Sequence, residues 1–322
     1  MSLPAYFFKR CLQALPLLLI ISIMAFAMLK ASPIDPLAAM RSNPSISQAA
    51  IDAEYRRLGL DKPNHEQYFI WLSNVMRGNL GMSSTGGQVA DRLAAHAGNT
   101  LLLNVITLIC TWAIALPAGV YAAVHRGRLL DKFFGLLTSI GMSMPAFLLA
   151  FLMLMVALAT KLLPIGGMTS ADFAQKDALG QMLDIAHHLV IPVTVLTFVS
   201  LASIQRQARS NLLDVLRADY VRTARAKGLP ENRVIYKHAL RNAVNPLITL
   251  LGFEFAALLS GAAITEMILS YPGLGRLTIE AVQTQDINLV MASLMLGAVM
   301  LVAGNLFADL LLKLTDPRIT LD

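Results

Sequence analysis

Charged residues are scarce in this sequence: only 14% of its 322 residues are Asp, Glu, Lys or Arg, whereas 56% are hydrophobic. Soluble domains are usually about 25% charged. A soluble chain of this composition would expose a large apolar surface to water, so the composition excludes an ordinary soluble enzyme.

The residue patterns that disulfide bonding, metal binding and ATP binding require are missing from the sequence. The two cysteines, Cys11 and Cys110, lie inside apolar runs, which excludes a disulfide framework or a thiolate metal cluster. His187 and His188 are adjacent, and adjacent residues of a helix point about 100° apart, so we expect interfacial histidines and no metal site. The phosphate-binding pattern G-x-x-x-x-G-K-S/T is missing. We therefore expect no ATP hydrolysis, catalytic site or cofactor on this chain.

Long apolar runs dominate the chain. About 20 apolar residues in a helix cross the ~30 Å hydrocarbon core of a bilayer. Six stretches approach or exceed this length, which predicts an all-α, polytopic membrane protein with six transmembrane helices, at residues 11–29, 100–124, 133–160, 189–205, 244–268 and 289–312.

Two of these spans contain proline, and the first has an alternative interpretation. Pro145 predicts a kink in the third span, which is either a packing kink or a broken helix that lines a pathway. The fourth span is the weakest, because it is short and contains Pro192. The first follows Lys9-Arg10 like a signal peptide, yet its apolar run exceeds the usual ~7–15 residues, which favours an uncleaved anchor.

Basic residues are unevenly distributed between the predicted spans. With the N-terminus inside, the inner segments carry 16 of the 26 Lys and Arg residues on 66 positions, and the outer segments carry 10 on 118. Cytoplasmic loops are enriched in Lys and Arg. We therefore predict an N-in, C-in orientation and attribute the net charge of +6 to topology, not to nucleic acid.

This topology predicts four regions. Residues 1–30 form the N-terminal transmembrane helix, 31–97 an extracytoplasmic segment, 98–313 the main transmembrane domain and 314–322 a cytoplasmic tail. In the extracytoplasmic segment, residues 51–59 predict a helix with a glycine stop, and residues 65–76 predict a second helix. These helices either pack at the membrane surface or receive an external partner.

The inner loop at 206–243 contains nine basic and three acidic residues. Its stretch 218–230 predicts a helix, a stop and a second helix: Gly228 suits a left-handed position after the first helix, and Pro230 suits the first turn of the next. Small residues at Ala218, Ala224 and Ala226 would let the loop enter a partner's cleft, and Arg222, Arg225 and Arg233 would pair with acids at its rim. The alternative is an ordinary basic loop that faces anionic lipid.

Motifs along almost the whole chain carry a family resemblance. They are Leu58-Gly59-Leu60-Asp61-Lys62-Pro63, Gly78-Asn79-Leu80-Gly81-Met82-Ser83, Met144-Pro145-Ala146-Phe147, Ala224-Arg225-Ala226-Lys227-Gly228-Leu229, His238-Ala239-Leu240-Arg241-Asn242-Ala243, Ile264-Thr265-Glu266-Met267, Pro272-Gly273-Leu274-Gly275 and Asp316-Pro317-Arg318. In this order they resemble permease subunits of ATP-binding-cassette importers, in the dipeptide, oligopeptide and nickel branch. The general loop pattern of the family has an acid and a terminal proline where this chain has Arg222 and Arg241, so a salt bridge from that acid cannot be carried over.

The resemblance implies a type I importer permease fold in the cell inner membrane. It implies four kinds of partner: a second permease, two cytoplasmic ATPases that hold ATP and magnesium, an extracytoplasmic binding protein and the lipid bilayer. By resemblance, the loop moves with the ATPases and opens the spans in alternating access. The expected coupling residues are Tyr220, Arg222, Ala224, Ala226, Gly228, Leu229 and Leu240.

Glu254 lies about ten residues inside the fifth predicted span, near mid-membrane. A carboxylate at this depth is costly unless it faces protein or water, so Glu254 is a candidate pathway residue, with Met144 and Pro145. A carboxylate that is protonated or paired in the bundle is the alternative. Glu266 is expected at the interface, and Asp309 with Asn305 in helix packing.

Two rival functions remain at this point. A proton-coupled transporter would use Glu254 as its relay, but such transporters usually carry more than one intramembrane acid and inverted repeats. A membrane-embedded enzyme needs a nucleophile with a base or two facing carboxylates, and the spans offer neither. Which peptide, thiol or metal is carried is left open by the sequence.

Overall fold

The computed structural model describes residues 3–32, 35, 37–248, 250–251, 254 and 263–315. Within these residues the secondary structure is helical, apart from turns and one isolated bridge between Met82 and Gln88. The predicted motif at 316–318 lies outside the described residues, as do residues 249, 252–253 and 255–262 of the fifth predicted span.

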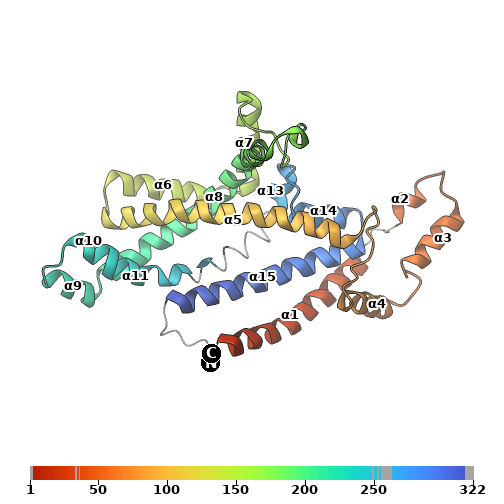
Figure 1. Ribbon diagram of the computed structural model, residues 1–322, viewed down its shortest axis with the longest axis horizontal. Coiled ribbons are helices and arrows are strands. Elements are labelled where there is room, and N and C mark those ends of the chain that lie inside the picture. The colour runs from red at the N-terminus through yellow and green to blue at the C-terminus, as the bar shows by residue number, and fades with distance from the viewer. Residues whose placement is uncertain are drawn as a thin grey trace.

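Three long helices run along the molecule (Figure 1): α1 at Leu3–Ala31, α5 at Val89–Val124 and α15 at Ile287–Thr315. A fourth, α8 at Ala178–Leu216, packs extensively against α5. Each of these four is long and apolar enough to cross a membrane, and the pair α6 and α7 makes a fifth candidate if it counts as one span. The six-span count therefore stays a prediction.

Three helices extend well beyond the predicted spans, the first of them beginning at Leu3 and not near residue 11. The second helix begins at Val89, well before residue 100, and the fourth covers Ala178–Leu216 instead of 189–205. Pro192 lies inside α8 without ending it. In these last two helices the polar flanks have good helix formers, so the helix continues beyond its apolar part. As a result, residues 206–216 belong to α8 and not to the basic loop.

The kink predicted at Pro145 is confirmed. Helix α6 at Leu129–Ser143 and helix α7 at Ala146–Thr160 meet at an angle of 104°. Met144 ends α6 and Pro145 precedes α7 with extended backbone. The residue before a proline avoids the helical region, and the proline itself cannot donate a backbone hydrogen bond, so the helix breaks here.

Small residues let the central helices approach closely. A Cβ atom on Gly119 of α5 would lie 2.7 Å from the Cβ of Ala208 on α8. A Cβ atom on Gly141 of α6 would lie 2.9 Å from the Cβ of Ala202, also on α8. Such contacts are a main source of helix association in lipid, where apolar burial adds little.

Helix α1 packs on α15 at the edge of the bundle. The Tyr6 hydroxyl donates to Asp309 at 2.7 Å, and the Arg10 guanidinium lies 3.2 Å from the same carboxylate. The packing role predicted for Asp309 is confirmed, whereas Asn305 is exposed.

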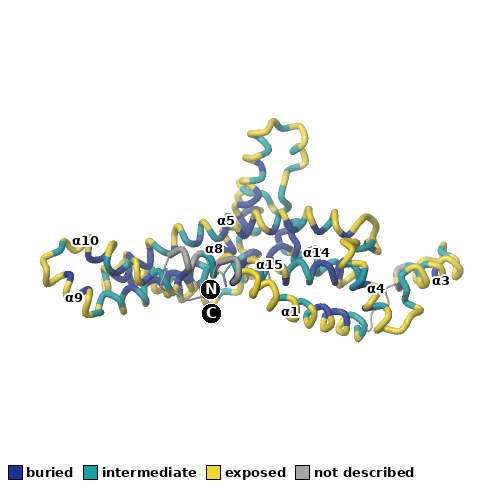
Figure 2. The backbone as a smooth tube through the Cα atoms, turned by 60° about the horizontal axis from the view of Figure 1, so that its bottom comes forward, coloured by how far each residue is buried: buried dark blue, intermediate teal, exposed yellow. Residues whose placement is uncertain are grey.

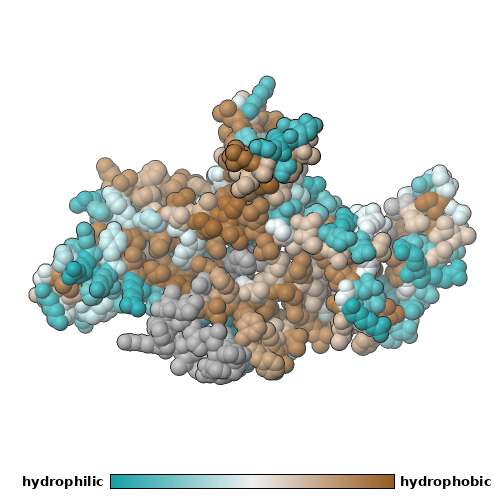
Figure 3. Space-filling view, in the orientation of Figure 1, coloured by the Kyte–Doolittle hydropathy of each residue, from teal (hydrophilic) through white to brown (hydrophobic). Residues whose placement is uncertain are grey.

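Shorter elements complete the two ends of the molecule. At one end lie α2 at Ala38–Arg41, α3 at Gln48–Arg57 and α4 at Asn64–Met76 (Figure 1), which confirms helices near 51–59 and 65–76, while their side of the membrane stays a prediction. Nearby are α13 at Ala263–Ile268 and α14 at Leu274–Gln283. The opposite end holds α9 at Asp219–Ala226, α10 at Glu231–Arg233, a π-helical turn η2 at Val234–Ala239 and α11 at Leu240–Ala243. Figure 3 shows hydrophilic residues at both ends and apolar residues across the middle.

Candidate coupling site

The segment from Asp219 to Ala243 forms a compact helical hairpin, which we call the coupling hairpin. Helix α9 ends at Ala226 and is followed by Lys227 and by Gly228, whose φ is +76°. The Gly228 amide donates to the Arg225 carbonyl at 2.9 Å, and the Leu229 amide donates to the Ala224 carbonyl at 3.4 Å. This pair of bonds is a Schellman motif, which requires a left-handed residue. The left-handed conformation predicted for Gly228 is confirmed.

The second arm of the hairpin begins one residue later than predicted. Pro230 is the N-cap of α10 and has extended backbone, so it precedes the first helical turn. The chain then enters η2, a π-helix of six residues, before α11. π-helices are rare and often occur at functional sites. This turn joins the tip of the hairpin to the segment that leads to Glu254.

The inner face of the hairpin packs on the rest of the chain. Val221 and Ala224 of α9 are buried with Val234 and Ala239 of η2, against Leu212 of α8. Leu229 and Leu240 are half-buried beside the same cluster. The expectation that Ala224 makes room for a partner was therefore wrong, because its methyl group faces this chain's own core.

The outer face of the hairpin is exposed (Figure 2). Tyr220 and Arg222 are exposed on α9, and Ala226 and Gly228 are exposed at the tip. The Asn242 amide donates to the Tyr220 hydroxyl at 2.8 Å and so links α9 to the end of η2 and α11. Of the predicted coupling residues, these four are open to a partner.

One of the three arginines that were predicted to pair with a partner's acids forms an ion pair within the hairpin. The Arg225 guanidinium contacts the Glu231 carboxylate at 2.7 Å, across the Gly228 turn. Its hydrogen bonds hold the pKa of Glu231 below the usual range and raise the pKa of Arg225. Arg222 lies 3.5 Å from Asp219 in an exposed pair, whereas Arg233 has no ion pair among the described residues. Arg225 therefore stabilises the turn by pairing with an acid of its own chain and not with a partner's acid.

An ion pair beneath the hairpin was missed by the sequence analysis. Asp131, at the start of α6, accepts from the Arg209 guanidinium at 2.6 and 3.0 Å, and from the Gly127 amide at 2.8 Å. The Asp131 side chain is only 7% exposed. The one available signal was that Asp131 is the single acid in the segment 125–132. The pair joins the turn before α6 to the end of α8 that carries the hairpin.

The candidate pathway residues are not brought together by hydrogen bonds among the described residues. Glu254 is half-buried, and the Ser203 hydroxyl of α8 donates to it at 3.3 Å. Met144 is half-buried and Pro145 exposed at the bend between α6 and α7. Glu254 thus has a polar neighbour, while its place in a pathway stays a prediction.

Glu266 is buried among side chains and amides of this chain, and its depth in the membrane stays a prediction. It is 1% exposed and accepts from the Thr100 hydroxyl at 3.0 Å and from the Arg276 amide at 2.9 Å. The Thr100 hydroxyl in turn accepts from the Leu274 amide at 2.7 Å. A carboxylate is stabilised by free amides at a helix N-terminus. Glu266 therefore holds α13, α14 and α5 together.

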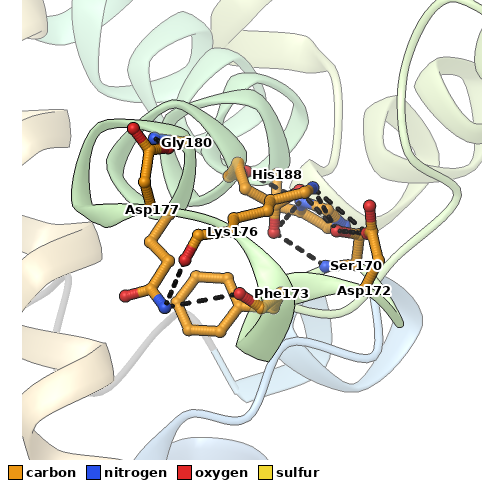
Figure 4. Close-up of polar contacts among 9 residues, drawn as sticks. Ser170, Asp172, Phe173, Lys176, Asp177, Gly180 and His188 are labelled. Atoms are coloured by element: carbon orange, nitrogen blue, oxygen red, sulfur yellow. Dashed lines mark hydrogen bonds and ion pairs between the residues drawn. The ribbon is translucent and has the colours of Figure 1, made fainter.

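His188 lies beside a loop that has its own polar network (Figure 4), and His187 is its neighbour in the sequence. The Lys176 ammonium contacts Asp184 at 2.7 Å, which raises the pKa of Lys176, and the Ser170 hydroxyl donates to Asp184 at 2.6 Å. His187 contacts the Leu162 carbonyl at 2.9 Å, and His188 contacts the Asp184 carbonyl at 2.8 Å. The network fastens the loop to the start of α8. No group of three or more metal-ligating side chains lies within the described part of the chain.

Taken together, several membrane-length helices and a basic hairpin at one polar end are the architecture of a polytopic membrane protein. The chain belongs to the family of binding-protein-dependent transport system inner membrane components, whose model matches residues 115–321, and the N-terminal model of such components matches residues 3–91. It is therefore an inner-membrane permease subunit of an ATP-binding-cassette importer, in the peptide branch, and a non-catalytic component of transport.

Relatives cover nearly the whole chain. The oligopeptide transport system permease protein AppB of Bacillus subtilis is 38% identical over 98% of this chain and 99% of its own length. The dipeptide transport system permease protein DppB of Escherichia coli K12 is 36% identical over 98% of both chains. A putative peptide permease of Brucella suis is 39% identical over 98% of both.

Proposed function

We propose that this chain forms, with a second related permease, the translocation pathway of an ATP-driven importer of dipeptides or oligopeptides. The names of the relatives, an oligopeptide and a dipeptide permease, support this substrate class. In the proposal, the chain crosses the membrane six times with both termini inside, and an extracytoplasmic binding protein delivers the peptide. Two cytoplasmic ATPases bind the ATP and magnesium.

The observation that carries the coupling proposal is the construction of the coupling hairpin. Its inner face is packed on α8 through Val221 and Ala224, while Tyr220 and Arg222 are exposed. A rigid hairpin that is exposed on one face transmits force to the helices behind it when a partner docks there. The Asp131–Arg209 pair extends this connection to α6.

In the proposed cycle, closure of the ATPase dimer moves the coupling hairpin, and α8 moves with it. The π-helical turn η2 continues toward the segment that carries Glu254. Glu254 would attract the α-amino group of a passing peptide or act as a gate. Met144 and Pro145 mark the bend at which α6 and α7 change direction.

Reconstitution tests this proposal. The permease pair, ATPases and binding protein are placed in proteoliposomes with a labelled dipeptide, and uptake is measured with ATP or with a proton gradient. We expect uptake only with ATP. Uptake that continued without ATP and collapsed with the gradient would favour a proton-coupled transporter that uses Glu254.

A further inference from the structure

A cavity of about 730 Å³ lies where α3, α4, the loop at 79–85 and the junction of α14 with α15 meet. We call it the outer cleft. Figure 1 places α3 and α4 at the same end of the molecule as this junction, opposite the coupling hairpin. Small-molecule sites usually measure about 300–1,000 Å³. The outer cleft therefore has the size of a site for a small ligand.

The floor of the outer cleft is apolar. Phe26, Ile70, Trp71 and Leu80 line it. Phe26 and Trp71 are buried and pack against the ring of Tyr68, with ring centroids 5.5 and 5.9 Å apart respectively. This support makes the aromatic floor rigid, so an apolar side chain of a ligand meets a preformed surface.

Side-chain amides surround the floor. Asn74, Gln283 and Asn288 line the outer cleft, and the Asn288 amide donates to the Met82 carbonyl at 3.1 Å. A carboxamide both donates and accepts hydrogen bonds, as a peptide group does. Gln285 also lines the cleft, with φ of +53° and little exposure, and such backbone strain concentrates at ligand sites.

The acidic side chains of the cleft have partners within this chain, whereas two of its basic side chains lack an acidic partner among the described residues. Its acids have partners: Glu54 lies 2.6 Å from Arg57, and Asp286 accepts from the Ser83 hydroxyl at 2.6 Å. Arg56 and Lys62 also line the cleft, and no carboxylate of the described chain lies within ion-pair distance of either. Two cations without acids at the edge of an amide-lined cleft favour a ligand with a carboxylate.

We propose that the outer cleft is an accessory binding site for a short peptide with a free C-terminus. The peptide's carboxylate binds Arg56 and Lys62, its main chain meets the amides, and an apolar side chain rests on the floor near Trp71. This inference rests on the proposed peptide-transport function, but the site lies at the outer end of the chain, apart from the candidate pathway at Glu254 and Pro145.

Calorimetry on the full chain in lipid nanodiscs tests the proposal, with trileucine and its C-terminal amide as probes. We expect saturable binding of trileucine that weakens about tenfold in the double variant Arg56→Gln, Lys62→Gln, because charge-assisted hydrogen bonds are lost. The C-terminal amide of trileucine should bind the unaltered chain about as weakly as trileucine binds the double variant. Its affinity should not fall further in the double variant. Arg77→Gln, an exposed cation outside the cleft, is the matched control and should leave binding unchanged.

Tryptophan emission locates the bound peptide, because the chain has only two tryptophans, Trp71 and Trp112. Trileucine should change the emission of the unaltered chain and of Trp112→Phe. The change should vanish in Trp71→Phe, which keeps an aromatic ring in the floor. An emission change that persisted in Trp71→Phe would place the peptide elsewhere and overturn the proposal.

Other outcomes separate the proposal from the function on which it rests. Absence of saturable trileucine binding, or binding that the double variant leaves unchanged, overturns the accessory site even if the reconstituted importer works. Binding of the extracytoplasmic binding protein that needs Arg56 and Lys62, without any binding of free trileucine, also overturns it and makes the cleft a protein-docking surface. Absence of ATP-driven peptide uptake in proteoliposomes contradicts the proposed function itself.

Discussion

Substitution of Gly228 tests the coupling hairpin at its turn. Gly228 has φ of +76°, and a Cβ atom built there would meet no atom within 4 Å. The cost of Gly228→Ala is therefore conformational, about 1–2 kcal/mol for an L-residue in the left-handed region. If the ATPases dock only on the intact turn, their affinity falls roughly 5–30-fold.

The series Gly228→Asn, Gly228→Ala and Gly228→Val sharpens this expectation. Asn tolerates the left-handed region and should weaken docking least, whereas β-branched Val should weaken it most. Binding of the purified ATPase pair to the permease in nanodiscs measures the affinities. The loss should appear together with reduced coupling of ATP hydrolysis to uptake.

Gly59 offers a matched control at the opposite end of the molecule. Its φ is +68°, and it too has open space around the missing Cβ atom. Gly59→Ala should suffer the same backbone strain without changing ATPase affinity. The reasoning fails if Gly228→Ala docks normally, or if Gly59→Ala weakens docking by the same factor.

Three further predictions concern single carboxylates. Glu254→Ala should reduce peptide uptake while the complex still assembles on gel filtration, and normal uptake would remove Glu254 from the pathway. Asp131→Asn should destabilise the chain by about 2 kcal/mol, since the charge-assisted bonds to Arg209 are weakened, and an unchanged thermal midpoint in nanodiscs would contradict this. Because Arg225 holds the pKa of Glu231 below its ordinary value of 4.5, this pair stabilises the hairpin above pH 4.5 and loses its effect as pH falls through the lowered pKa. The difference in thermal midpoint between the unaltered chain and Glu231→Gln should therefore be present at pH 7 and shrink below pH 4.5; a difference that does not change with pH would refute it.

Local signals predicted the local structure well. The conformation of Gly228 and the break at Pro145 depend on the backbone limits of one or two residues, and both are confirmed. The helix ends at Val89 and Leu216 were missed, because hydropathy marks the part of a helix that lies in lipid and not the whole helix. The family resemblance, spread over the whole chain, was likewise readable from the residues.

Contacts between distant segments were decided only by the tertiary structure. The sequence left Ala224 available to a partner, whereas α8 and η2 cover it, and it gave no sign that Glu266 is enclosed by α14 and Thr100. The sequence by itself determined composition, helical segments and turn conformations, because these depend on neighbouring residues. Which face of each helix is covered, and which charges meet across helices, depends on packing between segments that are far apart along the chain.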